Sequence, residues 1–391
     1  SEHFAEMLTP LFSEFDIRNI PIGKIKASSG HLPDIESGRR AMILYTSGTT
    51  GKPKGVVTTH DNIEAQIKSL VAAWQWQKND HILNVLPMHH VHGIINVLSC
   101  ALWIGACCEF LVKFDPAAIF QIFCRKKVNV FMAVPTIYYK LIAFWNDQNS
   151  VYQKEISGAL NNFRLMVSGS AALPISTLEQ WKSISGHTLL ERYGMTEMGM
   201  AISNPYRGER RPGYIGQPLD GVTIRIVDED GHQVEEGIPG EIQIKGPNVF
   251  KEYWEKPQAT KEAFVDGWFK TGDIATWENG SCRILGRNSV DIIKSGGYKI
   301  SALEIEEVLR THPDIKDCGV VGLPDEEWGE IIAASLVLDN HSNDLPELEA
   351  WLKERLPNYK IPRRFILQKD LPRNVMGKVT KKELQKIFAK L

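Results

Sequence analysis

The sequence of 391 residues lacks an excess of charge of one sign, paired cysteines and a long apolar run. Lys and Arg number 45 against 47 Asp and Glu, with no basic block, which argues against nucleic acid as the main partner. The six cysteines form no CxxC pair, so we expect structural thiols in a reducing compartment. The most apolar stretch, 94–112, is interrupted by Asn96, Ser99 and Glu109. This pattern predicts a buried helix followed by a strand, and no transmembrane segment.

No signal or transit peptide pattern begins at Ser1, and the chain contains no internal repeat. Its length exceeds that of a usual single domain, so we expect two or more. Between 41 and about 200, short apolar runs alternate with helical patterns, which predicts a layered α/β fold with mostly parallel strands. We expect strands at 82–86, 128–133 and 164–168, and helices at 61–74 and 135–145.

In the second half of the chain the predicted secondary structure changes twice, first to a β-rich pattern and then to an α+β pattern. Asp-Gly pairs at 220, 230 and 266 and an Asn-Gly pair at 279 predict turns in a β-rich subdomain. Its expected strands lie at 222–227, 241–245 and 282–285. After Arg287 we expect a compact α+β pattern, with Ser301 and Glu304 as a capping box for a helix at 302–311. Strands at 319–323 and 331–338 and helices at 345–356 and 381–390 complete it. The predicted domains are therefore 1–287 and 288–391.

The segment 45–55, YTSGTTGKPKG, follows a short apolar strand at 41–44. Glycines let the backbone bring its N–H groups close to an anion, while hydroxyl and ammonium groups bind phosphate oxygens. The spacing does not fit the Walker loop, and the alternative is a flexible polar linker. The predicted phosphate-binding residues are Thr46, Ser47, Gly48, Thr49, Thr50, Gly51, Lys52 and Lys54.

Other segments carry side chains suited to a nucleotide. The small-residue turn SGSAA at 168–172 leaves room for a flat ring against the backbone. In YGMTE, Tyr193 offers a stacking face, Thr196 a hydroxyl for the α-phosphate and Glu197 a carboxylate for Mg²⁺. In FKTGD, Asp273 can accept two ribose hydroxyls. Taken singly, each segment is also compatible with an ordinary turn.

In their order along the chain, these segments resemble the signatures of the adenylate-forming superfamily, which comprises acyl-CoA synthetases, luciferases and peptide-synthetase adenylation domains. The resemblance covers about residues 41–380 and implies that Lys378, in PRNVMGK, is the catalytic lysine. It implies adenine or AMP contacts by Gly169, Ser170, Ala171, Tyr193, Gly194 and Met195, and a ribose contact by Arg287. It also implies that Ser295, Gly296, Gly297 and Tyr298 line the path of coenzyme A.

The acid substrate is indicated by charge beside the YGMTE segment. A pocket for a fatty chain should be apolar, whereas the guanidinium of Arg192 suits a second carboxylate. With the histidines of PMHHVHG, this string resembles malonyl-CoA synthetases. The resemblance implies malonate, or a relative such as methylmalonate, bound by Arg192, His90, His92, Met195 and Ser203. In the alternative, Arg192 faces away and pairs with a surface acid such as Glu191.

The activity that the resemblance implies is that of an ATP-dependent acid–thiol ligase using Mg²⁺ and coenzyme A. The acid first forms an acyl-AMP; the small domain then rotates about a hinge at Ser289, Val290 or Asp291, and the thiol attacks. The resemblance suggests mitochondria or cytosol. The phosphate loop stands earlier than in the family, so we expect the N-terminal domain to be incomplete. The alternatives are a ligase for a medium-chain or aryl acid, and a truncated fragment without activity.

Overall fold

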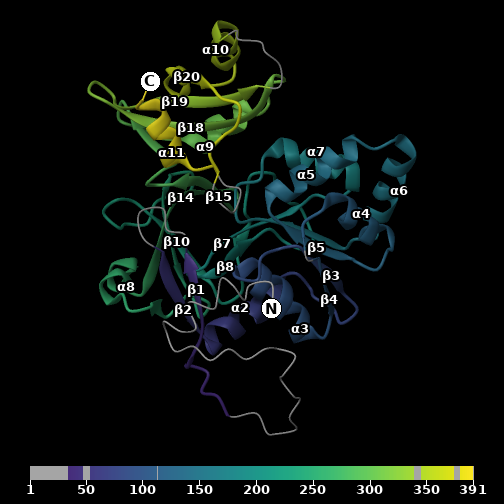
Figure 1. Cartoon of the computed structure of the whole chain (residues 1–391). Coiled ribbons are helices and arrows are strands. Elements are labelled where there is room, and N and C mark those ends of the chain that lie inside the picture. The colour runs from purple at the N-terminus through teal and green to yellow at the C-terminus, as the bar shows by residue number, and fades with distance from the viewer. Residues whose placement is uncertain (1–33, 47–52, 112, 339–344, 374–378, 391) are drawn as a thin grey trace, which may run out of the picture. The chain divides into compact units, whose positions relative to one another are not determined.

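The computed structural model of the chain describes residues 34–46, 53–111, 113–338, 345–373 and 379–390 (Figure 1). By its internal contacts the chain divides into Ser1–Arg39 and Arg40–Leu391. All the helices and strands given below belong to the second unit. The predicted domain boundary after Arg287 stays a prediction, although the last strand of one sheet ends at that residue and the next sheet begins at Ile292.

The largest sheet has seven strands in the order β4-β3-β5-β6-β7-β8-β9. The strands from β4 to β7 are parallel, and β8 and β9 add antiparallel pairs at one edge. Their bounds are β3 His81–Asn84, β4 Cys107–Phe110, β5 Val130–Ala133, β6 Leu165–Ser168, β7 Leu190–Met195, β8 Gly199–Ser203 and β9 Gln217–Pro218. The predicted α/β class with a mostly parallel sheet is confirmed.

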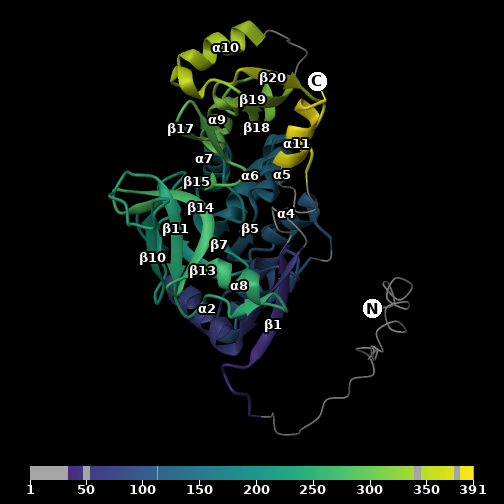
Figure 2. The ribbon, with the colours of Figure 1, turned by 90° about the vertical axis from the view of Figure 1, so that its left-hand side faces the viewer.

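Helices cover both faces of this sheet (Figures 1 and 2). Along β5, Val130 and Met132 belong to one buried cluster and Phe131 and Ala133 to the other, because successive side chains point to opposite faces. The first cluster includes residues of α2 His60–Ala73, the π-helix η3 His92–Ser99 and α3 Cys100–Ile104. The second includes residues of α4 Pro116–Cys124, α5 Pro135–Asn146, α6 Ser150–Leu160 and α7 Ile175–Ser185.

Local sequence sets several of these helix starts. Thr59 and Asn62 form a reciprocal capping box at α2, and Asp115 caps α4 with Pro116 at its first position. From residue 94 the apolar stretch forms helical turns up to Ile104 and then β4, so a helix followed by a strand is confirmed. Its helix is only partly buried, because Leu102 and Trp103 are exposed.

The phosphate-loop strand departs from the parallel pattern. Strand β1, Arg40–Thr46, pairs antiparallel with β2, Lys54–Thr59, in a three-stranded sheet closed by β12, Glu252–Tyr253. Placing this strand in the parallel α/β pattern was therefore wrong. Residues 47–52 of the predicted loop lie outside the described residues.

The β-rich part forms a five-stranded sheet of order β10-β11-β14-β13, with β15 pairing with β14. All of its pairs are antiparallel. Its strands are β10 Thr223–Val227, β11 Gly240–Lys245, β13 Phe264–Val265, β14 Trp268–Glu278 and β15 Ser281–Arg287, and helix α8 spans Pro257–Ala263. This sheet confirms the β-rich subdomain.

The last part of the chain is α+β, as predicted. A sheet of order β17-β16-β19-β18, with β20 beside β19, carries buried clusters on both faces. Its strands are β16 Ile292–Ser295, β17 Tyr298–Ser301, β18 Ile315–Asp325, β19 Gly329–Leu338 and β20 Arg364–Leu367. The helical elements are α9 Ala302–Leu309, α10 Leu345–Lys353, the 3₁₀ turn η4 Asn358–Lys360 and α11 Lys381–Phe388.

The predicted capping box at α9 is only half correct. The hydroxyl of Ser301 accepts a hydrogen bond from the N–H of Glu304 at 3.2 Å. The carboxylate of Glu304 pairs instead with Lys360, whose Nζ lies 2.7 Å from Oε1. In a full capping box the carboxylate of Glu304 would accept a hydrogen bond from the backbone N–H of Ser301. Here the ion pair with Lys360 of η4 takes its place.

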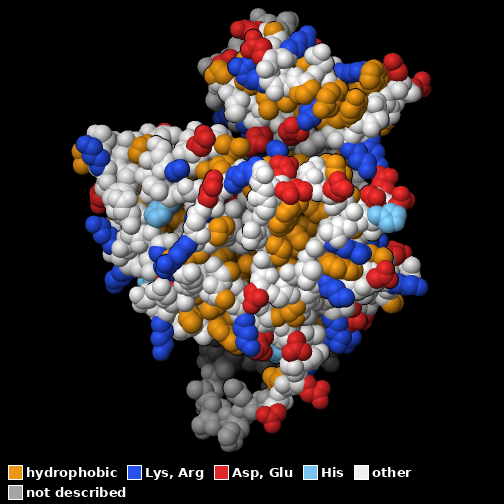
Figure 3. All heavy atoms as spheres, turned by 180° about the vertical axis from the view of Figure 1, so that it is seen from behind, with side chains coloured by type: hydrophobic (Ala, Val, Ile, Leu, Met, Phe, Trp, Pro, Cys, Tyr) orange, Lys and Arg blue, Asp and Glu red, His pale blue; other side chains and the backbone are white. Residues whose placement is uncertain are grey.

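Among the described residues, every helix is too short or too polar to cross a membrane. On the face shown in Figure 3, side chains of both charges are interspersed. This mixture reflects the near balance of 45 basic and 47 acidic residues.

Candidate active site

The predicted ribose residues meet at the junction of β7, β14 and β15. Asp273 and Arg287 are cross-strand partners, and Nε of Arg287 donates to Asp273 Oδ1 at 2.9 Å. The hydroxyl of Tyr193 donates to Asp273 Oδ2 at 2.6 Å. Burial raises the pKa of Tyr193 well above its usual value, and Asp273 adds to the shift, so the phenol stays protonated. Each carboxylate oxygen keeps a second lone pair that can accept a ribose hydroxyl.

The predicted metal residue Glu197 lies in the turn between β7 and β8. Tyr253 Oη donates to Glu197 Oε1 at 2.9 Å, and the backbone carbonyl of Glu197 accepts from the N–H of Phe250 at 2.7 Å. Nζ of Lys54 lies 4.2 Å from the centroid of the Tyr253 ring. Lys54 is also the register partner of Thr46, so the two residues that flank 47–53 of the phosphate segment are brought together near Tyr253.

The contact of Tyr253 with Glu197 was not predicted. The two residues are 56 positions apart, and no local pattern around Tyr253 marks it as a partner of the metal residue. Because Tyr253 uses one carboxylate oxygen, the other remains for a hard cation such as Mg²⁺. Thr196 is half-buried in the same turn.

The buried guanidinium of Arg192 is central to the candidate acid pocket. Its Nη2 donates to Ser170 Oγ at 3.2 Å, and Ser170 Oγ lies 3.4 Å from Nδ1 of His92. A Cβ on Gly169 would lie 2.4 Å from Cζ of Arg192, so only glycine fits beneath this side chain. The turn between β6 and α7, which also contains the exposed Ala171, thus holds Arg192 close to its backbone.

Among the described residues, Arg192 makes no ion pair with a carboxylate, and its Nε is buried without a hydrogen bond. Burial lowers the pKa of Arg192 to about 9, which leaves it charged at neutral pH. Burial also lowers the pKa of His92 well below its usual range, with smaller effects from Arg192 and His90, so His92 is neutral. Nε2 of His92 is likewise buried without a hydrogen bond. A buried cation with unused donors is suited to a carboxylate ligand.

The alternative in which Arg192 pairs with Glu191 is wrong. Adjacent strand residues point to opposite faces, and Glu191 accepts from the N–H of Gly213 at 3.0 Å instead. Ser203 also differs from expectation, because its hydroxyl donates to the carbonyl of Asn204 at 2.8 Å and accepts from Trp74 at 3.0 Å. With its one proton used, Ser203 has no donor for a carboxylate.

Two further predicted acid contacts remain predictions. His90 precedes η3 and is close enough to affect the pKa of His92. Met195 ends β7, next to Gly194, and packs against the core.

Three residues predicted to bind ribose, Mg²⁺ and a carboxylate therefore lie around β7: Asp273 contacts Tyr193 of this strand, Glu197 follows the strand in the next turn, and Arg192 belongs to it. The profile of the AMP-binding enzyme family matches residues 14–254, which is more than half of the chain. The chain belongs to the AMP-binding enzyme family. The profile of the AMP-binding enzyme C-terminal domain matches residues 304–378 as well.

Curated relatives and solved structures agree with this membership. The chain is 50% identical to malonate–CoA ligase ACSF3, mitochondrial, of Xenopus laevis, over 88% of the chain and 65% of the relative. The Homo sapiens protein of the same name is 45% identical, over 99% of the chain and 74% of the relative. ATP-bound MatB of Rhodopseudomonas palustris is 39% identical with a TM-score of 0.84, over 91% of the chain and 69% of that structure. The chain thus spans about two thirds to three quarters of these relatives.

In this AMP-binding enzyme, the predicted coenzyme A residues form the hairpin of β16 and β17. Gly296 and Gly297 have φ of +55° and +83°, as a two-residue hairpin turn requires. Ser295 is buried, and Tyr298 is exposed with its ring 4.6 Å from that of Tyr359. The turn gives a local reason for both glycines, and the coenzyme A role stays a prediction.

The predicted hinge residues Ser289, Val290 and Asp291 lie in the turn between β15 and β16. The predicted catalytic residue Lys378 lies outside the described residues. Its described flanks are close together, because Arg373 and Val379 form a β-bridge.

A pH-dependent stability follows from the acid beside Arg192. Burial raises the pKa of Glu191 to about 8, and Glu307 adds to this, while the N–H of Gly213 offsets part of it. Between about pH 4.5 and 8 the folded protein therefore holds a proton that the unfolded chain releases. The free energy of unfolding should fall as pH rises through this window, by up to about 1.4 kcal/mol per pH unit.

Glu191→Gln keeps a side-chain acceptor for Gly213 but cannot titrate. We expect its Tm to fall less than that of the wild type between about pH 5.5 and 8, as followed by circular dichroism. Parallel pH dependences of the two proteins would contradict this assignment.

Proposed function

We propose that this AMP-binding enzyme ligates malonate to coenzyme A with ATP, releasing AMP and pyrophosphate. The observation that carries the proposal is the buried Arg192, which has no carboxylate partner among the described residues and lies beside Ser170 and the neutral His92. The relatives named malonate–CoA ligase support it.

In the first step, one malonate carboxylate attacks the α-phosphorus of ATP, and pyrophosphate leaves as malonyl-AMP forms. The ribose lies against Asp273, which Tyr193 and Arg287 hold in place by hydrogen bonds. Lys54 and Thr46 lie toward the phosphates, and Lys378 stabilises the charge that develops as pyrophosphate leaves. Glu197 is the residue suited to hold Mg²⁺, which would neutralise phosphate charge.

The second malonate carboxylate binds Arg192. A guanidinium without a counterion is costly to bury, so a ligand that brings a negative charge is favoured over one that brings only an alkyl chain. His92 and Ser170 can add hydrogen bonds to the same carboxylate or to Arg192. Methylmalonate offers the same two carboxylates and differs by one methyl group.

In the second step, the thiol of coenzyme A attacks the carbonyl of malonyl-AMP, and AMP leaves with its phosphate. The pantetheine arm passes the hairpin that contains Ser295, Gly296, Gly297 and Tyr298. A rotation about Ser289, Val290 or Asp291 exchanges Lys378 for this hairpin between the steps.

Malonate-dependent exchange of labelled pyrophosphate into ATP tests the first step directly. We expect exchange with malonate or methylmalonate and much less with acetate, octanoate or coumarate. Exchange supported best by a monocarboxylate would contradict the dicarboxylate proposal.

The relatives from Xenopus laevis and Homo sapiens are named as mitochondrial. We propose the same compartment for this protein. Fractionation of cells that express the native protein should place it with a matrix marker, and recovery in the cytosol alone would contradict this.

A further inference from the structure

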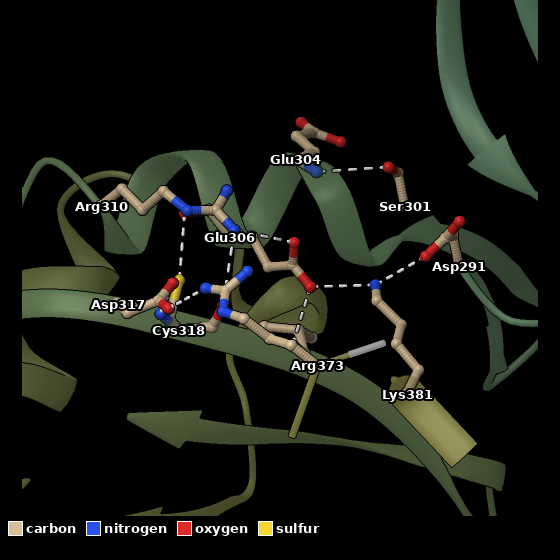
Figure 4. A network of polar contacts seen from close by, with 10 residues as sticks. Asp291, Ser301, Glu304, Glu306, Arg310, Asp317, Cys318, Arg373 and Lys381 are labelled. Carbon is tan, nitrogen blue, oxygen red and sulfur yellow. Dashed lines mark hydrogen bonds and ion pairs between the residues drawn. The ribbon is translucent and has the colours of Figure 1, made fainter. Parts of the chain in front are cut away.

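A largely buried group of three ionisable side chains lies next to the proposed hinge (Figure 4). Nζ of Lys381 lies 2.7 Å from Oδ1 of Asp291 and 2.9 Å from Oε1 of Glu306. The three residues come from α11, from the turn between β15 and β16, and from α9. Figure 4 shows the ammonium of Lys381 pointing between the two carboxylates.

The charged forms of Lys381 and Glu306 are favoured in this setting. Burial lowers the pKa of Lys381, but Glu306 and Asp291 outweigh it, so the net shift is upward. Burial raises the pKa of Glu306, but Lys381 and Arg310 outweigh it, so the net shift is downward. A second cation, Arg310, lies 3.2 Å from the other oxygen of Glu306.

Asp291 connects this group to the nucleotide end of the site. Its Oδ2 accepts from the backbone N–H of Arg287 at 2.9 Å, and its carbonyl accepts from the N–H of Ala302 at 2.8 Å. The side chain of Arg287 in turn pairs with Asp273. The carboxylate of Asp291 therefore contacts both the end of β15, at Arg287, and the helix that begins at Lys381.

Lys381 also lies at one end of the segment that contains Lys378. On the other side of that segment, Arg373 pairs with Asp317 of β18. The two flanks are joined to each other, because the N–H of Thr380 donates to the carbonyl of Pro372 at 2.8 Å. Arg373 and Lys381, which flank residues 374–378, therefore contact β18, α9 and the hinge turn.

We propose that Lys381 is a positioning residue for adenylate formation, because it ties the hinge residue Asp291 to the segment that presents Lys378. The proposal rests on the proposed function of this site. Lys381 acts through Asp291 and does not touch the reacting atoms. Because Lys378 serves the first step and leaves before the second, loss of Lys381 should slow adenylate formation far more than thiol transfer.

The competing interpretation is an ion pair that only stabilises the packing of α11. Such a role would lower stability and both half-reactions together. The contact with Asp291 makes the distinction measurable, because Asp291→Asn keeps the acceptor for Arg287 while it removes the charge facing Lys381.

The test compares Lys381→Met and Asp291→Asn with Lys382→Met, a matched control whose lysine is exposed on the same helix. Malonate-dependent pyrophosphate exchange measures the first half-reaction, and transfer from synthetic malonyl-AMP to coenzyme A measures the second. We expect Lys381→Met to lower the first roughly tenfold or more and the second less than about threefold. Lys381→Arg should restore part of the exchange.

Pyrophosphate exchange by the double variant Lys381→Met/Asp291→Asn should be little slower than exchange by the slower single variant, because both substitutions remove the same interaction. Equal losses in both half-reactions, or additive losses in the double variant, would overturn the proposal. Should Lys381→Met fail to fold, Asp291→Asn and Lys381→Arg carry the same comparison.

Hydrogen exchange of the backbone amides gives a readout that does not depend on the substrate. The amide hydrogens of Arg287 and Ala302 should exchange faster in Lys381→Met and Asp291→Asn than in the wild type. Their exchange rates should be unchanged in Lys382→Met. Unchanged exchange at both amides in Lys381→Met would overturn the positioning role. The wild type could also show no malonate-dependent activity while amide exchange is faster in the two variants. That result would support the contact between Lys381 and Asp291 as a structural link and would reject malonate as the substrate.

Discussion

Replacing Arg192 by leucine should lower kcat/KM for malonate by roughly 10²-fold or more. Truncating one partner of a buried, hydrogen-bonded charge pair costs about 2–5 kcal/mol, and each 1.4 kcal/mol is about tenfold. The free protein should lose no stability, because the guanidinium has no carboxylate partner among the described residues and its desolvation cost disappears. Steady-state kinetics and thermal unfolding measure both effects.

Arg207→Leu is the matched control, since Arg207 is exposed and lies outside the pocket. It should leave kcat/KM for malonate within about twofold of the wild type, as surface substitutions usually change little. Retention of malonate activity in Arg192→Leu, or a large fall in its Tm, would assign Arg192 a structural role.

Replacing Glu197 by glutamine should lower malonyl-AMP formation by roughly 10³-fold. The amide oxygen can still accept from Tyr253, so the turn is kept, but the negative charge that attracts Mg²⁺ is lost. Loss of several kcal/mol of charge stabilisation at the phosphates corresponds to this factor, at about 1.4 kcal/mol per tenfold change. Single-turnover formation of malonyl-AMP at saturating ATP and varied Mg²⁺ measures it.

Tyr253→Phe separates the metal role from the turn geometry. The substitution removes only the hydrogen bond to Glu197 Oε1, which is worth about 1 kcal/mol. We therefore expect the rate of malonyl-AMP formation to fall less than about tenfold. If Glu197→Gln and Tyr253→Phe reduced the rate equally, at any Mg²⁺ concentration, the metal assignment would be contradicted.

The fold could be predicted from the sequence where an apolar run does correspond to a strand of the parallel sheet. The strands β5 and β6 carry apolar runs because both of their faces are buried, and helices alternate with them. Strand β1 has a similar apolar run, yet it pairs antiparallel with β2. An apolar run does not specify its partner, which depends on contacts far along the chain.

The same limit applies to the site. Tyr193, Asp273 and Arg192 were predicted as site residues from the chemistry of short segments, and Arg287 from the family resemblance. The hydrogen bonds between these residues could not be predicted from the sequence, because partners such as Tyr193 and Asp273 lie 80 residues apart. The burial of Arg192 on the face opposite Glu191 follows from β7 being a strand, and no strand was predicted for this segment. The contact of Lys381 with Asp291 depends on tertiary structure in the same way.

We propose above that this AMP-binding enzyme joins a short dicarboxylate to coenzyme A. The most direct measurement incubates the purified protein with ATP, Mg²⁺, coenzyme A and an equimolar mixture of malonate, methylmalonate, acetate, octanoate and coumarate, and identifies the acyl-CoA products by mass spectrometry. We expect malonyl-CoA or methylmalonyl-CoA as the dominant product, formed with equimolar AMP and strongly reduced in Arg192→Leu. A dominant thioester of acetate, octanoate or coumarate, unaffected by that substitution, would contradict the proposed dicarboxylate substrate.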